Sequence, residues 1–139
     1  MKSALDSSVI VSALCAGDPD HDACRKVLLA GRHSVLAHAF AETFSTLTGG
    51  RLGFRLPASD AADLLGKRIA PKLRSITLEA EELLTAFGEA EARGVRGGAI
   101  YDYLHLFAAR KAGAKSFFTL NLGDFHSFHC PGDPEILSP

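Results

Sequence analysis

The sequence lacks the features that mark several classes of protein. Its 139 residues include only three cysteines (Cys15, Cys24 and Cys130) and no Cys-x-x-Cys pair, which argues against a disulfide scaffold or a zinc knuckle. No apolar run approaches the roughly 18 residues that cross a bilayer, and no basic region followed by a long apolar stretch opens the chain. We therefore expect a cytoplasmic protein with no membrane partner.

Several motifs of nucleotide and nucleophile chemistry are also missing. The chain has no Gly-x-x-x-x-Gly-Lys loop, no Gly-x-Gly-x-x-Gly turn and no Gly-x-Ser-x-Gly elbow. Its net charge of −1 gives no global evidence for nucleic-acid binding. The six histidines form no His-x-x-x-His pair, and we interpret them as structural or surface residues, with His126 and His129 as a minor metal candidate.

The sequence does contain an alternation of short apolar runs with helical periods. Its length favours one domain spanning residues 1–139, and 47% of the residues are hydrophobic, which is enough for a core. Strands are expected at 3–5, 33–38, 72–78, 115–120 and 136–137, with helices between them capped by Ser7 or Ser8, Ser59 and Thr77. This order predicts an α/β protein with a central, mainly parallel sheet of four to five strands and helices on both faces.

Polar residues follow two of the most strand-like segments. Asp6 directly follows the first strand, while Asn121 and Asp124 follow the strand ending at residue 120. In parallel sheets, ligands bind beyond the carboxyl ends of the strands. We therefore expect Asp6 and Asp124 to come together at one edge of the sheet.

Two further acids are candidates, and each also has an ordinary structural explanation. Asp102 lies in the first turn of its helix, where the helix dipole favours an acid, but it shares an inward-leaning row with Leu106. By helical periodicity Glu42 lies opposite the apolar side of its helix, which is typical of an exposed surface residue. Its position shortly after the second strand is what makes it a candidate.

Four converging carboxylates would need a cation. Two like charges about 4 Å apart repel by roughly 4 kcal/mol at an effective dielectric constant near 20. Oxygen-only ligands favour Mg²⁺ or Mn²⁺ over zinc, and such a site supports in-line chemistry at a phosphodiester. The predicted catalytic and metal-binding residues are Asp6, Glu42, Asp102 and Asp124. Asp6 and Asp102 are expected to hold the main ion, Glu42 to ligate it or orient water, and Asp124 to complete the cluster.

Basic residues gather between positions 51 and 74. This segment has six basic residues against two acidic ones, the basic residues being Arg51, Arg55, Lys67, Arg68, Lys72 and Arg74. A charge run of this kind is either a solvated helix surface or a surface that contacts RNA phosphates.

Four segments together resemble a known family. They are LDSSVIVSAL, AHAFAETFSTLTGG, IYDYLHLFAARKAGA and FFTLNLGDF. In this order they resemble the conserved blocks of PIN-domain proteins, and most closely the VapC-type toxins of bacterial toxin–antitoxin pairs.

The resemblance implies a three-layer α/β/α fold and a Mg²⁺- or Mn²⁺-dependent endoribonuclease. It also implies a homodimer that is neutralised by a cognate VapB-type antitoxin. The first three family acids fall on Asp6, Glu42 and Asp102, and the last block offers Asn121 and Asp124. Because Asn121 is an amide, Asp124 must supply the charge there, while Ser8 and Asn121 would hydrogen-bond around the ligands.

Two alternatives remain open at this point. The first is a catalytically silent PIN-like module that binds RNA or a protein partner, which the presence of all four acids disfavours. The second is a metal-dependent phosphatase or DNase that uses the same site.

Overall fold

A computed structural model describes residues 2–139 as a sheet of short strands surrounded by helices. The elements are β1 (Ser3–Leu5), α1 (Ser7–Leu14), α2 (His21–Leu29), β2 (Ser34–Leu36), α3 (His38–Gly49), α4 (Ala58–Leu64), the π-helix η1 (Leu65–Ile69), the 3₁₀-helix η2 (Ala70–Lys72), β3 (Arg74–Ile76), α5 (Ala80–Arg93), α6 (Ala99–Lys111), β4 (Ser116–Phe118), α7 (Leu122–Phe128) and β5 (Glu135–Leu137). The longest helix described, α5, has 14 residues. Within residues 2–139, none of the helices combines the length and apolar character needed to cross a membrane.

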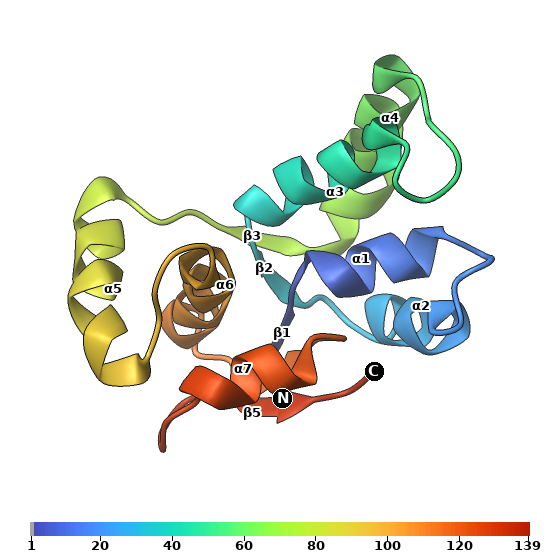
Figure 1. Ribbon diagram of the computed structural model, residues 1–139. Coiled ribbons are helices and arrows are strands. Elements are labelled where there is room, and N and C mark those ends of the chain that lie inside the picture. Colours follow the sequence, from blue (N-terminus) through green and yellow to red (C-terminus); the bar gives the residue numbers. More distant parts are fainter. Residues whose placement is uncertain (1) are drawn as a thin grey trace.

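The five described strands form one parallel sheet in the order β3-β2-β1-β4-β5 (Figure 1). The chain first builds outward from β1 through β2 to β3, and then returns to the other side of β1 for β4 and β5. The direction of growth therefore reverses between β1 and β4, where Ala4 pairs with Phe117. In open parallel sheets, the carboxyl ends of the strands at such a reversal frame a ligand-binding crevice.

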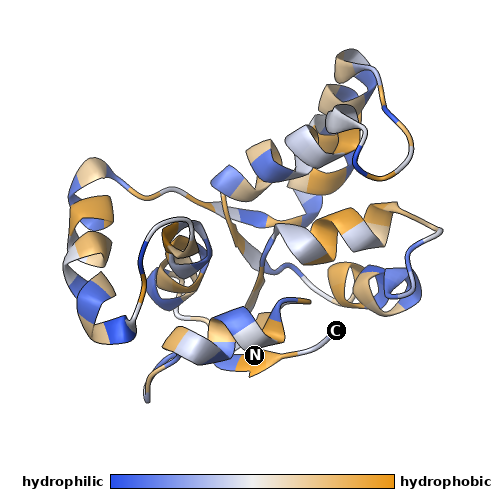
Figure 2. Cartoon of the chain, viewed as in Figure 1, coloured by the Kyte–Doolittle hydropathy of each residue, from blue (hydrophilic) through white to orange (hydrophobic). Residues whose placement is uncertain are grey.

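Consecutive residues of β1 and β4 pack on opposite faces of the sheet. Ala4 and Phe117 contribute to the core beneath α5, α6 and α7, whereas Leu5 and Phe118 pack with α1, α2 and α3. Figure 2 shows that most helices carry both hydrophobic and hydrophilic residues, as expected for helices with one face on a sheet. The predicted α/β/α architecture with a mainly parallel sheet of four to five strands is confirmed, and the described sheet has five strands, all parallel.

Three local expectations are wrong. The N-cap of α1 is Asp6, whose side chain accepts from the Ser8 amide, rather than Ser7 or Ser8. Helix α5 starts with a capping box of Glu79 and Glu82 instead of a Thr77 cap, and α4 follows Pro57 rather than a Ser59 cap. Helix α7 was not anticipated, because its seven residues lie directly behind a strand and are too few to show a helical period.

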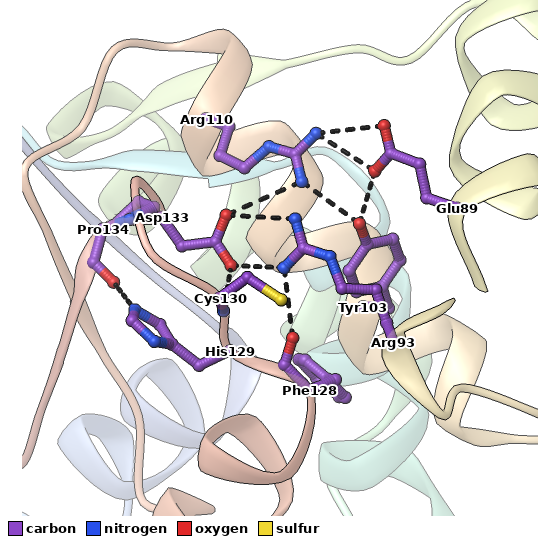
Figure 3. Close-up of polar contacts among 9 residues, drawn as sticks. All are labelled: Glu89, Arg93, Tyr103, Arg110, Phe128, His129, Cys130, Asp133 and Pro134. Atoms are coloured by element: carbon purple, nitrogen blue, oxygen red, sulfur yellow. Dashed lines mark hydrogen bonds and ion pairs between the residues drawn. The ribbon is translucent and has the colours of Figure 1, made fainter. Parts of the chain in front are cut away.

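A polar cluster ties α5 to α6 and to the C-terminal segment (Figure 3). Arg110 of α6 donates to Glu89 of α5 at 3.1 Å and to the hydroxyl of Tyr103 at 3.1 Å, and Tyr103 itself donates to Glu89. Arg93 makes an ion pair with Asp133, whose side chain is 3% exposed, and Arg110 lies 3.7 Å from the same carboxylate. We call these five residues the arginine cluster; it fixes α6 against its neighbours.

Candidate active site

The site lies where the carboxyl ends of β1 and β4 meet. The backbone N–H of Asp6 donates to the carbonyl of Phe118 at 3.4 Å, so the parallel pairing continues one residue past β1. The hydroxyl of Thr119, which is fully buried, donates to Oδ2 of Asp6 at 2.7 Å. The two segments, 113 positions apart in the sequence, are thus joined at the crevice that the strand order predicts.

Asp6 is a buried carboxylate held by fixed donors. Its side chain accepts from the backbone N–H of Ser8 at 3.1 Å, from the Ser8 hydroxyl and from Thr119, and the residue is 2% exposed. Burial raises the pKa of Asp6 above its ordinary value, although these hydrogen bonds and the charge of His105 act in the opposite direction. The carboxylate is therefore preorganised but costly to keep ionised.

The loop after β4 is anchored through hydroxyl groups. The backbone N–H of Leu120 donates to Oγ of Ser8 at 3.0 Å, and that of Asn121 donates to Oγ1 of Thr119 at 3.0 Å. Ser8, which we predict to be a supporting residue, also donates from its hydroxyl to Asp6. Thr119 is an additional supporting residue that the sequence analysis missed, and its only sequence signal is a hydroxyl placed directly behind a strand.

Asp102 is the candidate acid whose ionisation is affected by the other three. It lies in the first turn of α6 and is half-buried. Burial raises its pKa most, the charges of Asp6, Asp124 and Glu42 raise it further, and His105 acts against them. These three acids come from other elements, and the charge of each reaches Asp102; we call the four carboxylates the acidic cluster.

Glu42 is not the exposed residue that its helical position indicates. Its side chain is 29% exposed, and Oε1 lies 2.6 Å from Nε2 of His105. Burial acts to raise the pKa of Glu42, but the hydrogen bond and charge of His105, together with the charge of His38, outweigh it and lower the pKa. His105 is thus part of the site, which our general interpretation of the histidines missed.

The last block places Asp124 and Asn121 at the rim of the site. Asp124 lies in the first turn of α7 and is exposed, and its charge contributes to the raised pKa of Asp102. Asn121 is the N-cap of α7, but its side chain makes no capping hydrogen bond to the helix. Both side chains are therefore exposed to solvent, and the Asn121 side chain is not held by a capping hydrogen bond.

The donor set suits a hard cation, although it is not a closed cage. Asp6, Glu42, Asp102 and Asp124 offer only oxygen atoms, the ligands that Mg²⁺ and Mn²⁺ prefer. Within residues 2–139, no three His, Cys, Asp or Glu side chains converge closely enough to hold a metal ion by themselves. The residues fit an ion that keeps part of its water shell, as Mg²⁺ usually does.

A polar pocket of about 390 Å³ opens beside Glu42. Ser7, His38 and Arg51 line it together with Glu42, so one predicted RNA-binding cation lies close to the acidic cluster. The Arg51 guanidinium donates to Thr46 Oγ1 at 3.0 Å. The pocket therefore places the positive charge of Arg51 beside Glu42.

The loop that carries Arg51 starts at a glycine that no other residue replaces easily. Gly50 ends α3 with a φ of 85°, and a Cβ on it would lie 2.7 Å from Nε of Arg55. The side chain of Arg55 thus lies against the C-terminal end of α3. After this turn, Arg51 lines the pocket beside Glu42.

The remaining predicted RNA-binding residues lie on a different surface. Lys67, Arg68 and Lys72 line a hollow of about 600 Å³ around Pro71. Their helices η1 and η2 lead into the amino end of β3, whereas the acids lie at the carboxyl edge of the sheet. Arg74, the first residue of β3, is exposed. The structure thus divides the predicted basic surface into Arg51 at the acids and a separate patch.

Comparison with known proteins assigns the chain to a family. The PIN domain family matches residues 4–127, and the chain belongs to this family. Its curated relatives are VapC-type ribonucleases, which confirms the resemblance seen in the four sequence segments. Ribonuclease VapC27 of Mycobacterium tuberculosis is 34% identical over 106 residues, covering 76% of this chain and 75% of that protein. Ribonuclease VapC40 of the same species is 35% identical over 121 residues, covering 79% of this chain and 80% of that protein.

Solved structures share the fold at low sequence identity. The crystal structure of Mycobacterium tuberculosis VapC20, a sarcin–ricin loop cleaving toxin, matches with a TM-score of 0.71 and 18% identity over 96% of this chain and 100% of that one. VapBC2 from Rickettsia felis, bound to a promoter DNA fragment, has a TM-score of 0.64 and 18% identity, covering 100% and 99% of the two chains.

Proposed function

We propose that this protein is a Mg²⁺- or Mn²⁺-dependent endoribonuclease toxin that hydrolyses RNA phosphodiester bonds at the acidic cluster. The observation that best supports this proposal is the buried Asp6 carboxylate at the meeting point of β1 and β4, close enough to Asp102 that its charge raises the pKa of Asp102. Four acids gathered without an equal number of cations would be suited to a bound metal ion. The ribonuclease relatives support the same conclusion.

Each acid has a separate task in this proposal. Asp6, fixed by its hydrogen bonds, and Asp102 would hold the main ion, with Asp124 completing the cluster through water. Glu42 would ligate the ion and, from that position, orient the attacking water toward the phosphorus. A divalent ion bound there lowers the pKa of a coordinated water and offsets the negative charge of the phosphate.

The substrate is RNA, bound chiefly through its backbone. Arg51 shares the pocket of Glu42, so it would contact a phosphate close to the bond that is cut. The patch of Lys67, Arg68 and Lys72 would contact phosphates farther along the strand. These contacts supply affinity that an acidic site cannot supply by itself.

We further propose that the protein is a cytoplasmic homodimer and is held inactive by a cognate VapB-type antitoxin. Solved relatives include VapBC2 from Rickettsia felis and VapBC-1 from nontypeable Haemophilus influenzae. Exposed apolar side chains on this chain support a protein partner: Leu84 is 66% exposed, Phe87 48% and Tyr101 55%. Tyr101 also lines an apolar pocket of about 460 Å³.

The test is cleavage by purified protein freed of any antitoxin. Structured RNA should be cut in the presence of Mg²⁺ or Mn²⁺ and left intact when a chelator is added, while DNA and small phosphoesters should be poor substrates. Binding of RNA without cleavage under all metal conditions would instead indicate a catalytically silent module. Light scattering of the free toxin and of the toxin mixed with antitoxin tests the assembly.

A further inference from the structure

His105 links the two helices that carry Asp102 and Glu42. It lies on α6 three residues after Asp102, so both side chains project from the same side of the helix. Its Nε2 atom lies 2.6 Å from Oε1 of Glu42 on α3, and the residue is 2% exposed. The ring also borders a small internal void together with Leu5 and Val35.

The other ring nitrogen has no partner. Within residues 2–139, Nδ1 of His105 is the one buried side-chain nitrogen or oxygen atom without a hydrogen bond. A buried polar atom without a hydrogen bond destabilises the folded state, which an apolar side chain of similar size would avoid. Packing alone therefore does not account for a histidine at this position.

The hydrogen bond from His105 restrains a side chain that would otherwise be mobile, that of Glu42. Its long side chain is 29% exposed and stands at a pocket where it can adopt several rotamers. Among acids that repel one another, an unrestrained glutamate would swing toward solvent. The short contact to His105 opposes this movement and keeps Oε1 beside α6.

We propose that His105 is a positioning residue that holds Glu42 within the acidic cluster and thereby sets its affinity for a divalent cation. This inference rests on the proposed function of the cluster. It concerns the hydrogen bond from a buried ring to Glu42, and His105 itself does not contact the substrate or the ion.

Three substitutions separate this role from simple packing. His105→Gln places an amide nitrogen near the position of Nε2 and should keep most of the contact. His105→Asn places it near Nδ1, too short to reach Glu42, and His105→Leu fills the space without a donor. We expect Mn²⁺ affinity, measured by calorimetry on antitoxin-free protein, to fall by roughly 10–100-fold for the Asn and Leu variants and by much less for Gln.

A Glu42→Ala background provides the decisive control. If His105 acts through Glu42, His105→Leu should cause no further loss of Mn²⁺ affinity in that background. An equal loss with and without Glu42, or Mn²⁺ binding by His105→Leu at the wild-type level, would overturn the inference while leaving the proposed function intact. A folded wild-type protein that neither binds Mn²⁺ nor cuts RNA would instead overturn the proposed function, and the role of His105 with it. Circular dichroism confirms that each variant is folded.

Discussion

Helix α6 contributes residues to two clusters of acids that differ in their counter-charges: Asp102 to the acidic cluster, and Tyr103 and Arg110 to the arginine cluster. The acidic cluster joins Asp102 to three further carboxylates, and the pKa values of Asp6 and Asp102 are raised. In the arginine cluster, Glu89 and Asp133 face Arg93 and Arg110 instead. Burial acts against ionisation there too, but hydrogen bonds and the arginine charges lower both pKa values.

This difference distinguishes acids that stabilise the fold from acids that are available to bind a cation. A carboxylate paired with arginine stabilises the folded state when ionised, whereas one surrounded by other carboxylates destabilises it. Because Tyr103 and Arg110 lie on the same helix as Asp102, the arginine cluster fixes the helix on which the acidic cluster depends. One cluster therefore supports the geometry that the other uses.

The strongest test of this contrast removes one acid from each cluster. Asp102→Asn should reduce RNA cleavage by about a hundredfold or more, since losing even a supporting group of a metal ligand costs 10–100-fold. Single-turnover cleavage of a labelled RNA by antitoxin-free protein measures the effect.

The matched control is Glu89→Gln, which also removes one carboxylate that interacts with α6. Cleavage by this variant should stay within about twofold of wild type at a temperature where it is folded, because surface-facing contacts of this kind act on stability. Equal losses of activity in the two variants would contradict the proposed division between the clusters.

The arginine cluster should be the more sensitive of the two in stability. Asp133→Asn leaves Arg93 without its buried partner, and breaking such a pair costs about 3–5 kcal/mol in free energy of unfolding. Denaturant unfolding monitored by circular dichroism measures this loss. A variant as stable as wild type would show that the ion pair contributes nothing net to the fold.

The parts of the molecule that follow from local pattern could be predicted from the sequence. Apolar runs and helical periods located all five strands, and their alternation gave the parallel sheet and so the edge at which Asp6 lies. Contacts between distant elements could not be predicted in this way. His105 and Glu42 are 63 positions apart, and helical periodicity reports only that a side chain is buried, not which side chain it meets.

The N-cap of α1 was predicted wrongly for a different reason. The charge of Asp6 makes it a candidate metal ligand, yet its carboxylate also caps α1. Aspartate accepts from the first free amides of a helix as readily as serine does. One residue thus serves both the fold and the candidate site, and the sequence alone does not separate the two roles.

The two clusters should also respond oppositely to pH. The raised pKa of Asp102 means that its ionisation destabilises the metal-free fold as the pH rises above the ordinary value of 3.8 and through the folded pKa. Asp102→Asn should therefore raise the Tm by a few degrees at neutral pH, and the difference should vanish as the pH falls toward 3.8.

Asp133 has a lowered pKa, so its stabilisation is present above pH 3.8 and is lost only as the pH falls through the lower folded pKa. The Asp133→Asn variant should stay less stable than wild type down to about pH 3.8 and approach it only below. Thermal unfolding across this range checks both signs, and parallel pH profiles for the two variants would mean that their acids have similar environments.

The smallest expected effect concerns the cations rather than the acids. Arg51 lines the pocket of Glu42, whereas Lys72 lies on the separate basic patch. Each phosphate contact removed should lower the slope of log affinity against log salt by about one, so Arg51→Gln and Lys72→Gln should weaken RNA binding to a similar extent. Only Arg51→Gln, which removes the cation beside Glu42, should also slow cleavage of bound RNA. We expect its single-turnover rate at saturating protein to fall by a few-fold. If Lys72→Gln slows that step as much as Arg51→Gln, proximity to the acidic cluster does not distinguish the two basic surfaces.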